Sequence, residues 1–138
     1  MKSVLNPYLG FKDNAREAFE FYKTVFGGKV ELHTFEEYHA SEDLAEMKKI
    51  MHATLTADNG IMFMGADTPN SMTYEKPAGI SMSLSGDDEA ELSGYYEKLL
   101  EGGMAPMPFE VAPWGDKFGM VVDKFGITWM VNVTLKKD

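Results

Sequence analysis

The chain has 138 residues, of which 44% are hydrophobic and 25% charged, and its formal net charge is −9. These values are typical of one soluble globular domain. The absence of cysteine excludes disulfides, a thiolate nucleophile, a zinc finger and an iron–sulfur cluster. The negative charge opposes contact with nucleic acid and anionic membranes, and neither a signal peptide nor a membrane-spanning apolar run is visible. We therefore expect a cytoplasmic protein without nucleic-acid or membrane partners.

A strand followed by a helix is predicted at the start of the chain. Residues 4–11 alternate, so that Asn6 and Tyr8 share one face and the apolar side chains share the other. Asp13 or Asn14 can cap the helix that follows. Gly27-Gly28 ends that helix, because glycine accepts the left-handed conformation at a helix end.

Three more strands complete the first half. Residues 29–35 alternate between polar and apolar side chains, and a polar loop with a short helix near Ser41 follows. Residues 50–57 and 61–66 flank Asp58-Asn59-Gly60, a sequence that favours a tight hairpin. Residues 61–66 are apolar on both faces, so the periodicity leaves their orientation open.

The second half repeats this order of elements. Residues 79–85 alternate, with three serines on one face, and Asp87 or Asp88 can cap a helix that ends at Gly102-Gly103. Further strands are predicted near residues 105–111, 117–123 and 127–134. A repeated order of elements predicts two similar half-sheets that bury their faces together.

The predicted fold class is therefore α+β, with two βαβββ modules that form a curled, cup-like mixed sheet with helices outside. The modules span residues 1–70 and 78–138, and a loop joins them within one domain, residues 1–138. In the last strand Trp129 and its apolar neighbours should pack under a helix, while Met130 and Asn132 should face the cup.

A cup lined by tyrosine, methionine, serine, threonine and asparagine suits a small amphipathic ligand. Trp114 and Phe118 lie near the predicted mouth, where aromatic rings could stack on a ligand. Alternatively, these side chains close a small core or meet a second subunit. The candidate pocket residues are Asn6, Tyr8, Met62, Met64, Ser81, Ser83, Trp114, Phe118, Met130 and Asn132.

Two segments resemble a known family. NPYLGFKDNAREAFEFYKTVFGG is similar to the opening of the PhnB-like branch of the vicinal oxygen chelate superfamily, and WGDKFGMVVDKFGITWMVN is similar to its closing motif. That superfamily includes glyoxalase I, bleomycin-resistance proteins and extradiol dioxygenases. The resemblance implies a paired βαβββ fold and a homodimer. Proteins of this branch are often named 3-demethylubiquinone-9 3-methyltransferase.

The resemblance also raises the question whether this chain binds a metal ion. Catalytic members of the superfamily hold a divalent ion with His and Glu side chains from the first and fourth strands of each half. The corresponding positions here are Asn6 or Tyr8, Met62 or Met64, Gly79 or Ser81, and Met130. None of these is a carboxylate or an imidazole, and thioethers and hydroxyls are poor ligands for such ions. We therefore predict no metal and no cofactor.

Other chemistry has little support in the sequence. His33, His39 and His52 show no HxH or HExxH spacing, so hydrogen-bonded or solvated histidines are expected. Asp67 and Asp116 are candidates for acid–base work, although Asp116 is typical of a turn. No GxGxxG follows a strand, as a nucleotide-binding methyltransferase fold would commonly require.

These observations predict a PhnB-like, metal-free protein that binds an unidentified small molecule and forms a homodimer. The alternatives are an enzyme of the superfamily, either a metal-dependent lyase or a dioxygenase, and the methyltransferase of the family name. A third alternative is a structural dimer with a closed cup.

Overall fold

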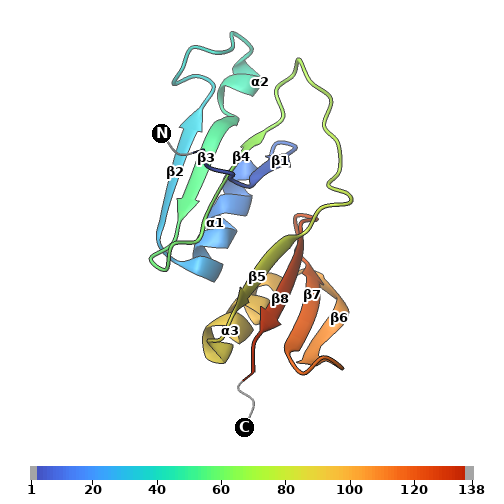
Figure 1. Cartoon of the computed structure of the whole chain (residues 1–138). Helices are drawn as coiled ribbons and strands as arrows, with labels where there is room; N and C mark the ends of the chain where they lie inside the picture. The colour runs from blue at the N-terminus through green and yellow to red at the C-terminus, as the bar shows by residue number, and fades with distance from the viewer. Residues whose placement is uncertain (1–2, 136–138) are drawn as a thin grey trace. The chain divides into compact units, whose positions relative to one another are not determined.

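A computed structural model describes residues 3–135, which divide between two compact units, Met1–Glu75 and Lys76–Asp138 (Figure 1). Each unit contains one long helix and one four-stranded sheet, and both follow the order strand, helix, three strands. The predicted α+β class and the predicted duplication are confirmed. Within residues 3–135, no helix is long and apolar enough to cross a bilayer.

The sheet of the first unit has the strand order β1-β4-β3-β2. β1 runs parallel to β4, and the other neighbours are antiparallel. A short extra helix, α2, lies between β2 and β3. The elements are β1 (Tyr8–Phe11), α1 (Ala15–Phe26), β2 (Lys29–Thr34), α2 (Leu44–Met47), β3 (Ile50–Thr56) and β4 (Met62–Asp67).

The sheet of the second unit has the equivalent order, β5-β8-β7-β6, and again only its first pair of strands is parallel. The duplication predicted from the order of elements therefore extends to strand order and direction. The elements are β5 (Met82–Gly86), α3 (Glu89–Leu100), β6 (Met104–Val111), β7 (Lys117–Val122) and β8 (Thr128–Val133).

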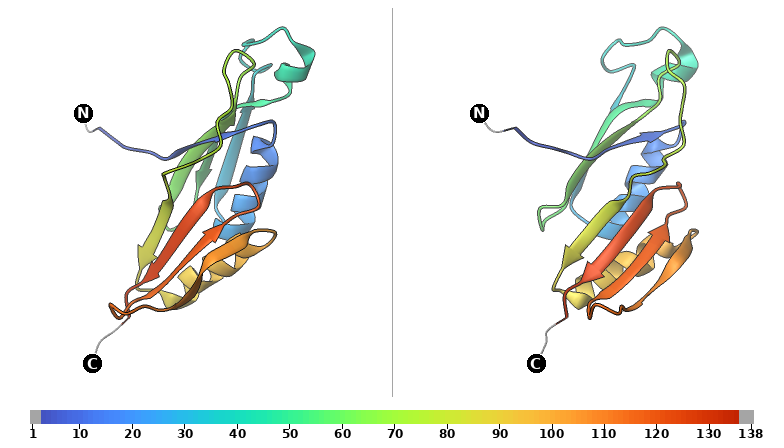
Figure 2. Two further views of the ribbon diagram at one scale, coloured as in Figure 1. Left: turned by 90° about the vertical axis from the view of Figure 1, so that its right-hand side faces the viewer. Right: turned by 45° about the vertical axis from the view of Figure 1, so that its right-hand side comes forward.

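Each long helix packs against one face of its own sheet (Figure 2). In the first unit Phe63 on β4 lies among three rings of α1, with centroid distances of 5.7 Å to Phe19, 5.4 Å to Tyr22 and 5.8 Å to Phe26. Because side chains alternate along a strand, Met62 and Met64 lie on the opposite face. The packing of Phe63 thus settles the orientation that the apolar sequence of residues 61–66 left open.

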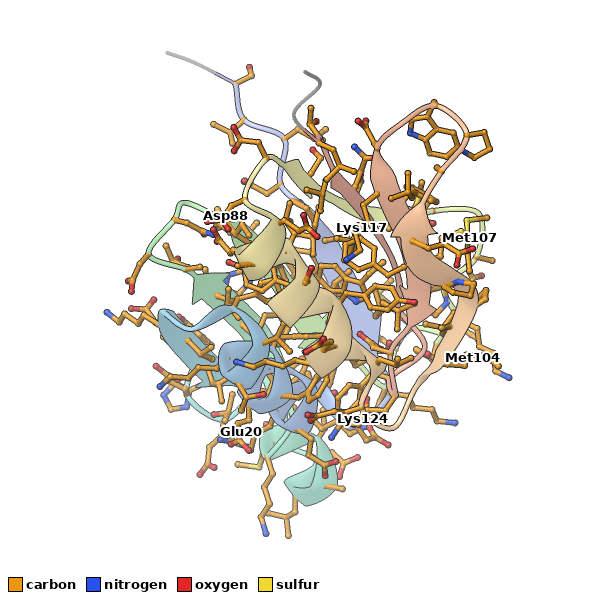
Figure 3. The ribbon with its side chains drawn as sticks, turned by 90° about the horizontal axis from the view of Figure 1, so that it is seen from below. Glu20, Asp88, Met104, Met107, Lys117 and Lys124 are labelled. Atoms are coloured by element: carbon orange, nitrogen blue, oxygen red, sulfur yellow. The ribbon has the colours of Figure 1, made fainter. Side chains whose placement is uncertain are left out.

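In the second unit, α3 covers the buried side chains of β8. Trp129, Val131 and Val133 are at most 1% exposed, as the alternation of the last strand predicts. Beside them Phe109 stacks on Tyr96 at a centroid distance of 4.9 Å, and the Lys117 ammonium lies 4.5 Å from the Phe109 ring centroid. Figure 3 shows Lys117 next to α3, where its ammonium also lies 3.4 Å from a carboxylate oxygen of Glu89.

The two long helices begin differently. The Asp88 side chain accepts a hydrogen bond of 3.0 Å from the Glu91 amide, so the predicted cap of α3 is confirmed. Asn14 precedes α1 but makes no capping hydrogen bond with its side chain. The Ala15 amide donates instead to Asp67 Oδ1, at 2.9 Å, from the end of β4.

The first strand of each unit starts later than the periodicity predicts. β1 begins at Tyr8 rather than at residue 4, and Leu5 is 97% exposed. Proline offers no N–H to a ladder, and Pro7 joins the sheet only through its carbonyl, which accepts a 3.0 Å hydrogen bond from the Met64 amide. β5 begins at Met82, and Ile80 is 81% exposed. Asn6 and Ser81 therefore lie just before their strands.

Candidate functional site

The candidate site lies on the face of the first sheet that α1 does not cover, here called the helix-free face. Strand register places four of its side chains in one row across the sheet: Tyr8 pairs with Met64, Met64 with Thr54, and Thr54 with Glu31. The structure therefore brings three of the candidate pocket residues, Tyr8, Met62 and Met64, to one face. Asn6 precedes the strand by two positions.

A hydrogen-bonded array crosses this face and is centred on His52. The Tyr8 hydroxyl lies 3.2 Å from His52 Nδ1, and the Thr54 hydroxyl lies 3.1 Å from His52 Nε2. The centroids of the Tyr8 and His52 rings are 5.7 Å apart. Burial raises the pKa of the Tyr8 phenol, so its hydroxyl keeps its proton. The sequence predicted a hydrogen-bonded or solvated histidine at residue 52 but gave no sign of its partners.

An apolar pocket of about 360 Å³ lies beside this array. Its walls come from β1, β3 and β4, from Phe35 just after β2, and from the segment that follows β4. Two tyrosines and two methionines are among the residues that line it, and a Cβ added at Gly10 would meet no atom within 4 Å. The lining residues include Tyr8, Gly10, Met51, Ala66, Met72 and Tyr74.

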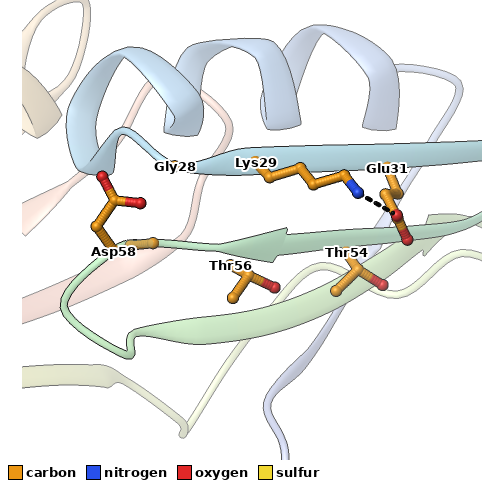
Figure 4. Close-up of a pocket in the computed structure, with 7 residues that line it drawn as sticks. Gly28, Lys29, Glu31, Thr54, Thr56 and Asp58 are labelled. Carbon is orange, nitrogen blue, oxygen red and sulfur yellow. Dashed lines mark ion pairs between the residues drawn. The ribbon is translucent and has the colours of Figure 1, made fainter.

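A polar pocket of about 600 Å³ lies on the same face, toward the β3–β4 hairpin (Figure 4). Lys29 Nζ and Glu31 Oε1 form an ion pair of 3.0 Å at its edge, and both side chains are largely exposed. The hydrogen bond from Lys29 holds the pKa of the Glu31 carboxyl below its usual range. Thr54 lines this pocket and also contacts His52, whereas Tyr8 lines the apolar pocket. The array therefore has one residue, Thr54, in the polar pocket and another, Tyr8, in the apolar pocket.

The remaining candidate residues belong to the second unit. Ser83 pairs with Met130, and Asn132 pairs with Phe118, so these four side chains share the face of the second sheet that α3 does not cover. The Trp114 ring contacts the Phe118 ring at a centroid distance of 5.5 Å and is 56% exposed.

The two carboxylates considered for acid–base work have other roles. Asp67 is 3% exposed, and its two oxygens accept hydrogen bonds of 2.9 Å from the Ala15 and Ile50 amides. It is therefore a structural residue that ties α1 and β3 to β4. Asp116 accepts a 3.2 Å hydrogen bond from the Asn132 amide group, and its backbone carbonyl closes a turn with the Ala112 amide.

The residues present do not fit the divalent ion of the superfamily. The positions that the resemblance assigns to its ligands hold Asn6 or Tyr8, Met62 or Met64, Gly79 or Ser81, and Met130, and none of these carries a carboxylate or an imidazole. His33 is on the same face as His52, but its Nδ1 lies 3.0 Å from Glu37. Within residues 3–135, no group of three or more histidine and acidic side chains is placed to hold an ion.

Comparison with known proteins identifies similar chains. A family model described as 3-demethylubiquinone-9 3-methyltransferase matches residues 3–132. The curated protein YjdN of Escherichia coli K12 is 28% identical over 141 residues, which cover 94% of each chain.

Solved structures extend the similarity. Protein PA1353 of Pseudomonas aeruginosa is 36% identical, with a TM-score of 0.82 over 98% of this chain and all of that one. The PhnB protein of Bacillus cereus is 23% identical, with a TM-score of 0.71 over 96% of this chain and all of that one. A glyoxalase/bleomycin resistance protein/dioxygenase superfamily member from Sphaerobacter thermophilus shares the fold at 18% identity, with a TM-score of 0.57 over 96% and 98% of the chains.

Proposed function

Because this chain belongs to the 3-demethylubiquinone-9 3-methyltransferase family, the PhnB-like branch with the glyoxalase fold, we propose that it binds a small molecule without a metal ion. The ligand occupies the helix-free face of the first unit. A homodimer in the cytoplasm is part of the same proposal.

One observation carries this proposal: Tyr8 and Met64, at two positions where the resemblance would place metal ligands, lie side by side on the helix-free face, and Tyr8 lines an apolar pocket there. Pockets of this size and composition, with a few polar groups, are typical of sites for small organic molecules. Methionine and tyrosine supply polarizable and aromatic contact area but are poor ligands for hard cations. The site therefore favours binding through packing and neutral hydrogen bonds.

Filling the apolar pocket should abolish ligand binding. A Cβ on Gly10 meets no atom within 4 Å, so Gly10→Leu should place its side chain in the pocket without a backbone clash. We expect neutral one- and two-ring aromatic compounds to bind the native chain in ligand-observed NMR, and the variant to bind at least about tenfold more weakly because it occupies their space. Gly94→Leu, at an equally open position on α3, is the matched control. Binding by none of the compounds, or equal binding by both variants, contradicts the proposal.

Two binding experiments, one with metal ions and one with S-adenosylmethionine, separate the proposal from the enzymatic alternatives. Incubation with nickel, zinc, manganese or iron followed by elemental analysis should leave less than one ion per chain, because the required ligands are missing. Calorimetry with S-adenosylmethionine should give no heat and no shift in melting temperature. Gly27 and Gly28 follow the end of α1, so they cannot direct a helix N-terminus at a nucleotide. One ion bound at micromolar affinity overturns the metal-free site, and binding of S-adenosylmethionine supports the methyltransferase name.

A further inference from the structure

The His52 array has a direction, because each of its hydrogen bonds needs one donor and one acceptor. A neutral imidazole carries one N–H, so one ring nitrogen donates while the other accepts. Either Tyr8 donates to Nδ1 and Nε2 donates to Thr54, or both bonds are reversed. A phenol is a far stronger acid than an aliphatic hydroxyl, so the phenol is the better donor to an imidazole nitrogen. The first arrangement is therefore favoured.

In that arrangement the hydroxyl proton of Tyr8 is already donated to His52 Nδ1. Its oxygen then has only lone pairs to offer a ligand in the apolar pocket, which Tyr8 lines. The hydrogen of the Thr54 hydroxyl is free to face the polar pocket, since the Thr54 oxygen accepts from His52. The tautomer of His52 thus decides whether Tyr8 offers the apolar pocket an acceptor or a donor, and whether Thr54 offers the polar pocket a donor or an acceptor.

We propose that the Tyr8–His52–Thr54 array makes the apolar pocket selective for ligands whose polar group donates a hydrogen bond, such as an aromatic hydroxyl, while His52 is neutral. This inference rests on the proposed function and names its ligand class. A ligand of the same shape that can only accept a hydrogen bond meets the lone pairs of Tyr8 and gains no bond there.

Protonation of His52 should remove the preference, because an aromatic hydroxyl can accept a hydrogen bond from Tyr8 as well as an acceptor-only ligand can. An imidazolium donates from both nitrogens, so the Tyr8 oxygen becomes the acceptor and its hydrogen turns toward the pocket. The ionisable groups facing His52 are Tyr8 on β1 and His33 and Glu31 on β2, and Glu37 pairs with His33. On β4 this face carries Met64 and Ala66, whereas Asp67 is buried on the helix side.

A matched pair of probes tests the inference. The two-ring probes 2-naphthol and 2-methoxynaphthalene share a ring system, but only 2-naphthol can donate a hydrogen bond. At about pH 8, with His52 shown to be neutral by its imidazole nitrogen-15 shifts, we expect 2-naphthol to bind about two- to tenfold more tightly, which is the range for one net hydrogen bond. At a lower pH at which the imidazole nitrogen-15 shifts show His52 protonated, the ratio of the two affinities should fall to about one. Equal binding of both probes at about pH 8 overturns the inference but leaves the pocket intact.

Three variants assign the effect to the array. Tyr8→Phe should bind both probes equally at either pH, because it keeps the ring and removes the acceptor oxygen. His52→Gln should keep the preference for 2-naphthol at low pH, since an amide can accept from Tyr8 and donate to Thr54 without titrating. His33→Gln, on the opposite strand, should behave like the native chain. A pH response that disappears in His33→Gln and persists in His52→Gln contradicts the assignment.

A measurement without any ligand separates this inference from the proposed function. Imidazole nitrogen-15 chemical shifts of the native chain should show neutral His52 protonated at Nε2 and bare at Nδ1. The opposite tautomer overturns the inference even if both probes bind. If neither probe binds at millimolar concentration, the pocket and the ligand class both fail, whichever tautomer is found.

Discussion

Replacing Asp67 with alanine is expected to lower the free energy of unfolding by about 4 kcal/mol. The carboxylate is buried, and it is the acceptor for the amides of Ala15 and Ile50, two residues that are at most 1% exposed. Its removal leaves two buried N–H groups without this partner, at a cost of about 1 to 3 kcal/mol each. Urea denaturation followed by far-UV circular dichroism measures the change.

Two further variants sharpen this test. Asp67→Asn keeps one acceptor oxygen but turns an NH2 group toward an amide N–H, so its loss should be large but smaller than that of alanine. Asp116→Ala removes one hydrogen bond of 3.2 Å from a half-buried carboxylate and should lower the stability by about 1 kcal/mol or less. If Asp67→Ala is no more damaging than Asp116→Ala, the assigned structural role of Asp67 is wrong.

Gly28→Ala is expected to destabilise the chain by about 3 kcal/mol. Gly28 has φ of +80°, and a Cβ there would collide with the Thr56 carbonyl oxygen on the neighbouring strand. The left-handed conformation costs an alanine about 1 to 2 kcal/mol, and the collision with backbone adds about 1 to 3 kcal/mol because backbone cannot turn aside as a side chain does. The midpoint of urea unfolding reports the loss.

The duplication supplies a partner and a control for this experiment. Gly103 holds the equivalent place in the second unit, and a Cβ there would collide with the Val122 carbonyl oxygen. Gly103→Ala should therefore also be strongly destabilising, although its φ is not in the left-handed region. Gly10→Ala meets no atom within 4 Å and should change the stability little. Native-like stability of both Gly28→Ala and Gly103→Ala would refute the close approach.

The glycine pairs show which structural features neighbouring residues can predict and which they cannot. Both pairs were predicted as helix ends, and Gly27 and Gly102 have φ of +72° and +74° after α1 and α3. The second glycine of each pair is needed for a different reason, the approach of a strand about twenty residues or more away along the chain. Helix-end chemistry is contained in a few neighbouring residues, whereas strand proximity is not.

The sequence alone determined the α+β class, the repeated order of elements and which side chains of the last strand are buried, because these follow from local periodicity, capping and turn residues. Only the tertiary structure decided the orientation of β4, the role of Asp67 and the contact of Tyr8 with His52, 44 residues apart in the chain. The physical reason is register: alternation gives each strand two faces, but pairing with a distant strand and packing under a helix decide which face is buried and which side chains meet.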